Sequence, residues 1–143
     1  MYAQTILNEA TDIRDILIKD RRMLHQNPEV GMTLPKTMSY IRQQLAAMGY
    51  DPIDIGGGVV AEIGKPNGKS VLLRADADAL PIVEKTGLSF AAQNGCMHAC
   101  GHDMHAAMLL GAARLLKKHE DELGCRVRIV FQPDEEGFRG AKS

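Results

Sequence analysis

Two short segments carry most of the side chains suited to chemistry. The first, MHACGHDMH at residues 97–105, holds one thiol and three imidazoles within nine residues. The second, QPDEEG at residues 132–137, places two adjacent glutamates after an apolar stretch. Thiolate, imidazole and carboxylate groups are ligands of zinc, manganese and cobalt. Because a further carboxylate beside such ligands suits proton transfer, the two segments together predict metal-assisted hydrolysis.

Cys100 and His102 are the sharpest candidates for metal ligands. The small Gly101 between them lets two ligands turn toward one centre. We place this segment at the start of a helix, where the helix dipole lowers the pKa of a thiol and stabilises the thiolate. A C-x-H spacing on its own more often marks a buried structural cysteine beside a capping histidine. The glutamate pair at a strand end favours the metal-binding interpretation here.

A structural zinc knuckle is a weaker alternative for the same segment. Cys96 adds a C-x₃-C spacing, and His105 adds an H-x₂-H spacing with His102. Structural zinc sites use two ligand pairs separated by a spacer, whereas all the donors here crowd together. His98 and His105 are therefore left open, either as groups that support the ligands or as polar loop residues.

The adjacent carboxylates of Glu135 and Glu136 are expected to play different roles. In an extended backbone neighbouring side chains point to opposite faces. One glutamate then ligates metal while the other faces the substrate and its attacking water. The alternative is a solvated acidic turn, which the buried strand before the pair makes less attractive.

Asp76 and Asp78 are two residues apart, so an extended strand would place both on one face. They are candidates for metal ligands or for groups that orient an imidazole from behind. An equally good alternative is an ion pair between Asp76 and Arg74, with Asp78 capping a turn.

The elements that must position these residues follow from hydrophobic periodicity and from turn residues. We expect helices at about 6–24, 35–48 and 102–119, with Thr33 as a possible cap of the second. We expect strands at 59–63, 71–74 and 126–132, and a loop at 81–95. Residues 56–58, all glycine, predict a flexible joint, and residues 65–68 predict a turn that pairs the first two strands as a hairpin. Residues 71–73 are apolar on both faces, which indicates a central strand. This order predicts an α/β layer architecture whose candidate residues follow strand ends or open a helix.

Composition limits the broad class of protein. The 143 residues are enough for one domain, and the 45% hydrophobic and 24% charged residues are ordinary for a globular chain. The net charge of −1 and the scattered basic residues argue against a nucleic-acid or membrane-surface partner. The sequence contains no apolar run long enough to span a bilayer. Three cysteines, an odd number, favour a reducing cytoplasmic setting over a disulfide framework.

Four motifs give the chain a family resemblance. They are LRADADALP at 73–81, MHACGHD at 97–103, FQPDEEG at 131–137 and RRMLHQNPE at 21–29. The first three, in this order and spacing, resemble the aminoacylase-like metallopeptidases, which include hippurate hydrolase, N-acyl-amino-acid amidohydrolases and indoleacetyl-amino-acid hydrolases. The segment at 21–29 resembles the N-terminal signature of the same family. The resemblance implies that Cys100 bridges two metals, that His102 ligates one of them and that Glu136 ligates the other. It further implies that Glu135 is the general base and that Asp78 is an acid supporting the metal centre.

The same resemblance implies the following expectations for the whole molecule. The fold is part of a zinc-peptidase-like catalytic domain, α/β, with a mixed sheet packed by helices. The activity is hydrolysis of the amide bond of N-acyl amino acids with two divalent metal ions (zinc, manganese or cobalt), in a homodimer. Family members are much longer and carry a dimerisation domain and two further histidine ligands. We therefore expect residues 1–143 to be the N-terminal portion of the catalytic domain, and an inactive metal-binding fragment is the alternative.

Two departures from the family pattern stand near these motifs. Asp134 takes the place of a small residue before the two glutamates and would add a negative charge near the site. Leu34 stands where the family often has glutamate. Neither is one of the proposed ligands.

Overall fold

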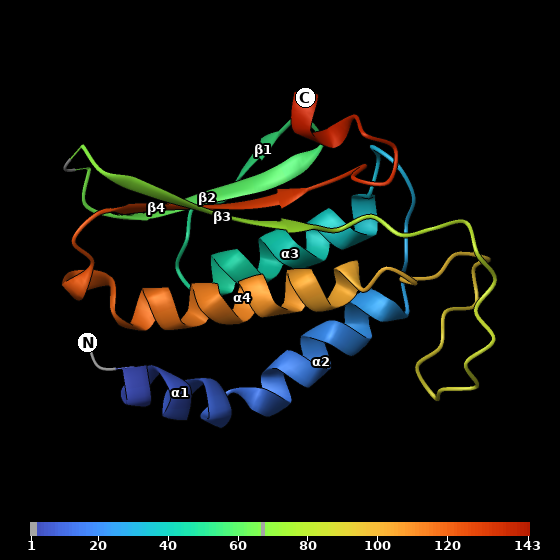
Figure 1. Ribbon diagram of the computed structural model, residues 1–143, viewed down its shortest axis with the longest axis horizontal. Coiled ribbons are helices and arrows are strands. Elements are labelled where there is room, and N and C mark those ends of the chain that lie inside the picture. The colour runs from blue at the N-terminus through green and yellow to red at the C-terminus, as the bar shows by residue number, and fades with distance from the viewer. Residues whose placement is uncertain (1–2, 67) are drawn as a thin grey trace.

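The computed structural model describes residues 3–66 and 68–143 (Figure 1). Its elements are α1 (Ala3–Asp12), α2 (Arg14–His25), α3 (Pro35–Ala47), β1 (Ile53–Ile55), β2 (Gly58–Gly64), β3 (Ser70–Asp76), α4 (His102–Lys118), η1 (Glu120–Glu122), β4 (Arg126–Gln132) and η2 (Gly140–Lys142). The described strands form a four-stranded sheet in the order β1-β2-β4-β3. β1 and β4 are antiparallel to β2, and β3 is parallel to β4. The expected mixed sheet packed by helices is confirmed.

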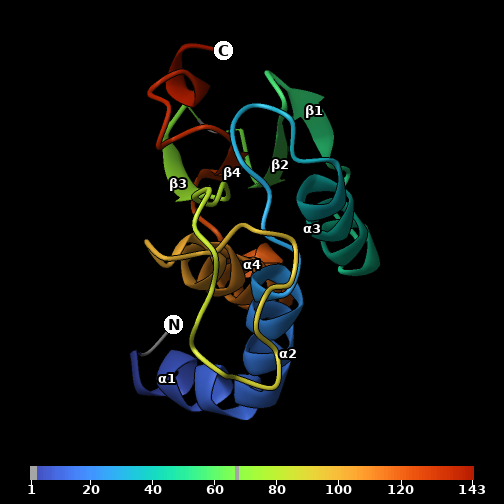
Figure 2. The same ribbon diagram turned by 90° about the vertical axis from the view of Figure 1, so that its right-hand side faces the viewer.

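The helices lie in two layers on one face of the sheet. Figures 1 and 2 show α3 and α4 against the sheet and α1 and α2 on the far side of α4. β4 buries alternate residues toward these helices, as a sheet with one covered face requires. The buried core includes Val59, Ala61 and Ile63 of β2, Val127, Ile129 and Phe131 of β4, Ile41 and Leu45 of α3, and Ala106, Leu110 and Ala113 of α4. Within the described residues, no helix is long and apolar enough to cross a membrane.

The predicted hairpin between the strands at 59–63 and 71–74 is wrong. β4 lies between β2 and β3 and pairs with both, so β3 is an edge strand and not a central one. Leu72, taken as part of a doubly buried strand, is 60% exposed. The chain does reverse direction between β2 and β3, and the predicted turn at 65–68 includes Asn67, which lies outside the described residues. Local turn chemistry does not choose the partner strand. The central position goes to β4, whose Val127, Ile129 and Phe131 are buried, and β3, with Val71 exposed, lies at the edge.

The three glycines at 56–58 form a tight turn and not a flexible joint. Ile55 pairs with Gly58, which leaves Gly56 and Gly57 as a two-residue hairpin loop. Their φ angles of 56° and 80° lie in the left-handed region that such a turn demands of both central residues. The short strand β1 was therefore missed because its turn residues were interpreted as a linker.

The helix boundaries largely follow the sequence. α4 and β4 occupy the predicted ranges, and residues 81–95 form the predicted loop. The first helix is interrupted at Ile13, which separates α1 from α2. At α3 the N-cap is Leu34, without a side-chain cap hydrogen bond, so Thr33 is not the cap. Leu34 is instead a buried core residue.

A buried polar cluster ties α2 and the loop after β3 to the first turn of α4. His25 Nδ1 lies 2.7 Å from Asp103 Oδ2, and its Nε2 lies 3.0 Å from Glu84 Oε1. Arg21 Nε donates to the same Asp103 oxygen at 2.8 Å. Buried charges persist only when they are paired in this way. His25 thus has a structural role, and the cluster holds the helix start that carries the candidate ligands.

Glu84 makes this cluster sensitive to acid. Burial alone raises the pKa of Glu84, but hydrogen bonds from Thr86, His25 and the Ala92 amide outweigh burial and lower this pKa to about 2. Because folding depresses the pKa, the stabilisation is complete above the ordinary value of 4.5 and is lost as the pH falls toward 2. Glu84→Gln should therefore flatten the decline of the free energy of unfolding across this acid range. Urea unfolding followed by circular dichroism at several pH values measures this slope, and a slope equal to that of the wild type would contradict the prediction.

Candidate functional site

Three chain segments bring the candidate residues together at one end of the sheet. β3 ends at Asp76, and the parallel strand β4 ends beside it, with Asp76 opposite Gln132. Asp78 follows β3, and the glutamate pair at 135–136 follows β4. The N-terminus of α4 reaches the same place, because His102 contacts Asp78. Because carboxyl ends of parallel strands meet at one edge, side chains that are distant in sequence become neighbours here.

His102 lies at the centre of the cluster with its two ring nitrogens in different surroundings. Nδ1 lies 2.9 Å from the Asp78 carbonyl oxygen and 3.2 Å from Asp78 Oδ1. Both of these groups are acceptors, so Nδ1 carries the proton and Nε2 keeps its lone pair. Nε2 faces Glu135 Oε2 at 3.7 Å and Glu136 Oε1 at 3.8 Å. Metal-ligating histidines are oriented in the same way: one ring nitrogen donates to a carboxylate or a carbonyl, and the other is left for the metal.

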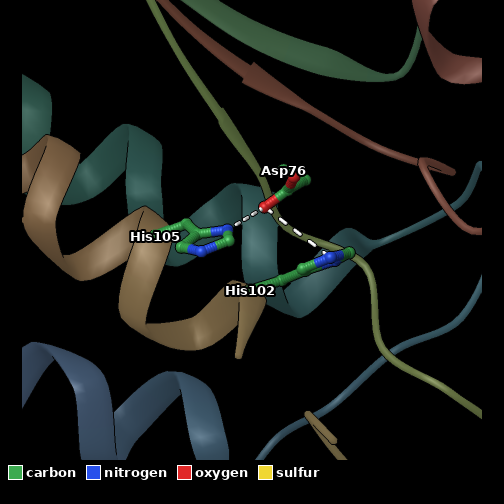
Figure 3. Close-up of side chains that lie close together, drawn as sticks. All are labelled: Asp76, His102 and His105. Atoms are coloured by element: carbon green, nitrogen blue, oxygen red, sulfur yellow. Dashed lines mark hydrogen bonds and ion pairs between the residues drawn. The ribbon is translucent and has the colours of Figure 1, made fainter. Parts of the chain in front are cut away.

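Two groups of three donor residues share this imidazole. Ligand atoms of Cys100, His102 and Glu136 lie within 4.8 Å of one another, and so do ligand atoms of Asp76, His102 and His105 (Figure 3). Glu136 Oε1 is buried and has no hydrogen-bond partner in the described structure. A buried carboxylate oxygen without a partner is costly unless a cation or a proton satisfies it. The thiol, imidazole and carboxylate set therefore fits a borderline divalent metal.

The two glutamates face the same centre, contrary to the extended backbone assumed for them. Residues 135–138 form a turn, which follows the left-handed φ of 50° at Asp134. The turn is fastened by the Phe138 amide, which donates to the Glu135 carbonyl at 3.0 Å. Glu136 is the more buried of the two, with 27% of its side chain exposed against 38% for Glu135. Proximity alone thus does not separate their roles, and burial favours Glu136 as the ligand.

Asp78 connects two of the candidate segments. Its buried carboxylate accepts from the Glu136 amide through Oδ2 at 3.1 Å, and it contacts His102 through Oδ1. Asp78 thereby links the β4 turn to the α4 start. This placement supports the predicted role of an acid that backs the metal centre, which stays a prediction until the residue is replaced.

Asp134 does not add the negative charge expected near the site. Its side chain is buried and accepts from Arg139 Nε at 2.6 Å. The guanidinium neutralises the carboxylate locally, so this departure from the family pattern leaves the charge of the cluster unchanged.

The Cys100 thiol differs from expectation in its acidity. Gly101, with a φ of 88°, allows the chain to turn between Cys100 and the first residue of α4. The helix start predicted a lowered pKa, but the hydrogen bond with Glu136, followed by burial and the nearby charges of Glu135 and Asp76, raises the pKa of Cys100. The neighbouring carboxylates disfavour the negatively charged thiolate.

Two histidines in this region were not assigned by sequence reasoning. His105 lies one helical turn beyond His102, and its Nδ1 is 2.6 Å from Asp76 Oδ1. The i, i+3 spacing on a predicted helix indicates that His102 and His105 are neighbours on the helix surface. His98 is buried and has no hydrogen-bond partner for either ring nitrogen among the described residues, and burial lowers its pKa to about 4. His98 is therefore a neutral imidazole at neutral pH.

A surface groove of the described residues lies away from this cluster. The groove has a volume of about 620 Å³ and lies between α1–α2 and α4. Its wall includes Leu17, Ile18, Phe90, Met104 and Met108, and none of the candidate site residues lines it. The donor cluster is accordingly a partly open group of polar side chains at the sheet end.

Comparison with known proteins defines the class of this chain. The model of peptidase family M20/M25/M40 matches residues 72–143. The N-acetyl-L-cysteine deacetylase of Bacillus subtilis (strain 168) is 49% identical over 129 residues, which are 87% of this chain and 31% of that protein. The IAA-amino acid hydrolase ILR1-like 5 of Arabidopsis thaliana is 44% identical over 140 residues, 95% of this chain and 32% of that protein.

The fold agrees with these relatives. The YXEP protein of Bacillus subtilis, described as a dinuclear metal binding peptidase from the M20 family, superimposes with a TM-score of 0.87 at 42% identity, over 92% of this chain and 38% of that chain. The chain belongs to peptidase family M20/M25/M40. It spans about a third of the length of the curated relatives it matches.

Proposed function

We propose that this chain supplies the N-terminal part of the catalytic domain of a metal-dependent amidohydrolase that cleaves the amide bond of N-acyl amino acids. The observation that carries the proposal is the convergence of Cys100, His102 and Glu136 within 4.8 Å of one another, with Glu135 facing the same imidazole. The relatives named as an N-acetyl-L-cysteine deacetylase and an IAA-amino acid hydrolase support an acylated amino acid as the substrate class. A catalytically inactive metal-binding fragment remains the alternative function of the 143 residues alone.

The residues divide the chemistry between them. Cys100, His102 and Glu136 would hold metal, and a divalent ion there would supply a Lewis acid that polarises the amide carbonyl and activates water. Glu135, the more exposed glutamate, accepts the proton of the attacking water and passes it to the leaving nitrogen. Asp78 fixes the tautomer of His102 and the backbone of Glu136, so that the ligands keep their mutual geometry.

Two divalent ions, of zinc, manganese or cobalt, belong to this proposal. The similarity to a dinuclear metal binding peptidase supports the number, and the mixed sulfur, nitrogen and oxygen donors support this group of metals. We also propose a homodimer as the active assembly and a cytoplasmic setting. A reducing compartment would keep Cys100 available as a ligand.

The metal site is tested directly by replacing its thiol. Loss of a residue that hydrogen-bonds to a metal ligand typically weakens metal binding roughly 10- to 100-fold. Cys100→Ser removes a ligand and should weaken the binding of zinc or cobalt by more than this. It should also remove the thiolate-to-cobalt charge-transfer absorption. Titration of the purified chain with a competing chelator measures the affinity. Cys125→Ser is the matched control because Cys125 precedes β4, at the other end of that strand from the glutamate pair. Equal metal affinity and equal spectra in the wild type and Cys100→Ser would contradict the site.

A further inference from the structure

His119 lies at the opposite end of α4 from His102, between the last residue of that helix and the first residue of η1. Its side chain is largely buried, with 13% exposed. We propose that the protonated His119 is a pH-sensitive latch that holds α1 and η1 to the C-terminal end of α4, and that loss of its proton releases α1. This inference does not depend on the proposed metal site or on the proposed activity.

The two ring nitrogens of His119 each face a carboxylate. Nδ1 lies 2.7 Å from Glu122 Oε1, and Nε2 lies 2.7 Å from Glu9 Oε2. An ionised carboxylate can only accept hydrogen bonds, whereas a neutral imidazole has one N–H donor and one bare lone pair. The neutral ring therefore satisfies one glutamate and repels the other. Only the doubly protonated imidazolium donates to both.

The surroundings of His119 favour this charged form. The hydrogen bonds with Glu122 and Glu9 outweigh burial and raise the pKa of His119 above its ordinary value of 6.5. The C-terminus of α4 adds the negative end of the helix dipole, which also favours a cation. Among the described residues, the charged groups that face the ring are thus Glu9 of α1 and Glu122 of η1. The neighbouring Lys117 pairs with Glu120 at 2.7 Å.

α1 has no buried side chain to anchor it to the rest of the fold. None of residues 3–12 is buried, and the break at Ile13 separates this helix from α2. Figure 1 shows α1 below the C-terminal half of α4. Within the described part of the chain, the ion pairs between α1 and α4 all use Glu9, which binds Lys118 Nζ at 2.6 Å as well as His119. Once His119 loses its proton, Lys118 is left to hold Glu9.

Attachment of α1 should therefore weaken as the pH rises. Because folding raises the pKa of His119, its stabilisation is complete below the ordinary value of 6.5 and is lost as the pH rises through the pKa of the folded chain. α1 also supplies Ala10 and Thr11 to the wall of the groove between α1–α2 and α4. Release of α1 at alkaline pH thus opens that groove on one side.

Amide hydrogen exchange of the purified chain tests the latch. In the wild type, the protection of residues 3–12, corrected for the intrinsic exchange rate, should fall about two- to fivefold between about pH 6 and about pH 9, the range of one surface ion pair. His119→Gln keeps a hydrogen-bond donor without the charge, so its protection should be low at both pH values. Glu120→Gln is the matched control, because it removes a carboxylate of η1 that pairs with Lys117, and it should keep the wild-type fall.

Titration of the His119 ring by NMR measures the pairing itself. We expect a pKa above the ordinary 6.5 in the wild type and a lower pKa in Glu9→Gln. A wild-type pKa of 6.5 or less, or one that Glu9→Gln leaves unchanged, would overturn the inference.

The exchange data can overturn it independently. Equal protection of α1 at both pH values in the wild type, or a wild-type fall in His119→Gln, would refute the latch. Loss of the fall in Glu120→Gln would do so too, because any acidic group near this end of α4 would then have the same effect. Circular dichroism verifies folding of each variant. Should His119→Gln not fold, Glu9→Gln on the unburied α1 provides the comparison, and a wild-type fall in that variant refutes the latch.

Discussion

Replacing Glu135 by glutamine in the full-length enzyme is expected to abolish turnover while leaving bound metal nearly unchanged. The side chain faces the His102 imidazole from a more exposed position than Glu136, which suits contact with water and substrate. Loss of a general base of this kind lowers the rate by about 10² to 10⁴ or more. Glutamine keeps the size of the side chain but accepts no proton, so the loss reports proton transfer and not packing.

Glu136→Gln is the paired variant, and comparing the two distinguishes a general base from a metal ligand. Its buried oxygen has no hydrogen-bond partner in the described part of the chain, which predicts loss of metal together with loss of activity. Steady-state kinetics and metal analysis of both purified variants provide the comparison. Equal metal loss in the two variants would mean that the two glutamates have been assigned wrongly.

The second large effect concerns the 143-residue chain by itself, which is expected to show no amidohydrolase activity. Two metals about 3.5–4 Å apart need more donors than the cluster around His102 offers. The groove between α1–α2 and α4 lies away from this cluster, so it does not orient an acyl amino acid against it. Metal bound by the chain would therefore lack both a second ion and a positioned substrate.

Incubation of the purified chain with manganese or zinc and N-acetyl or N-benzoyl amino acids tests this expectation. Product formation should not exceed that of a Glu135→Gln control at equal metal content. Multiple turnovers by the wild-type chain, absent from that control, would show that these residues suffice for catalysis.

Local chemistry determined much of this protein from sequence alone. The apolar alternation in residues 126–132 predicts a buried strand at the observed bounds, and the periodicity after Gly101 predicts α4. Both signals depend on neighbours in the chain, which periodicity reports directly. The motifs around Cys100 and Glu136 also identified a metal-type cluster, because the residue types needed for that chemistry are scarce and were adjacent.

Tertiary structure alone decided which strands pair and which side chains meet. β4 lies between β2 and β3, where its Val127, Ile129 and Phe131 join the buried core, and no local turn signal reports this long-range burial. The left-handed φ at Asp134 turns both glutamates toward His102, although an extended backbone would have separated them. Asp76 and His105 meet across 29 positions of sequence because β3 and α4 pack together, and no spacing rule links a strand end to the second turn of a helix. Residue types and short spacings thus determine the available chemistry, and long-range burial of apolar surface determines its geometry.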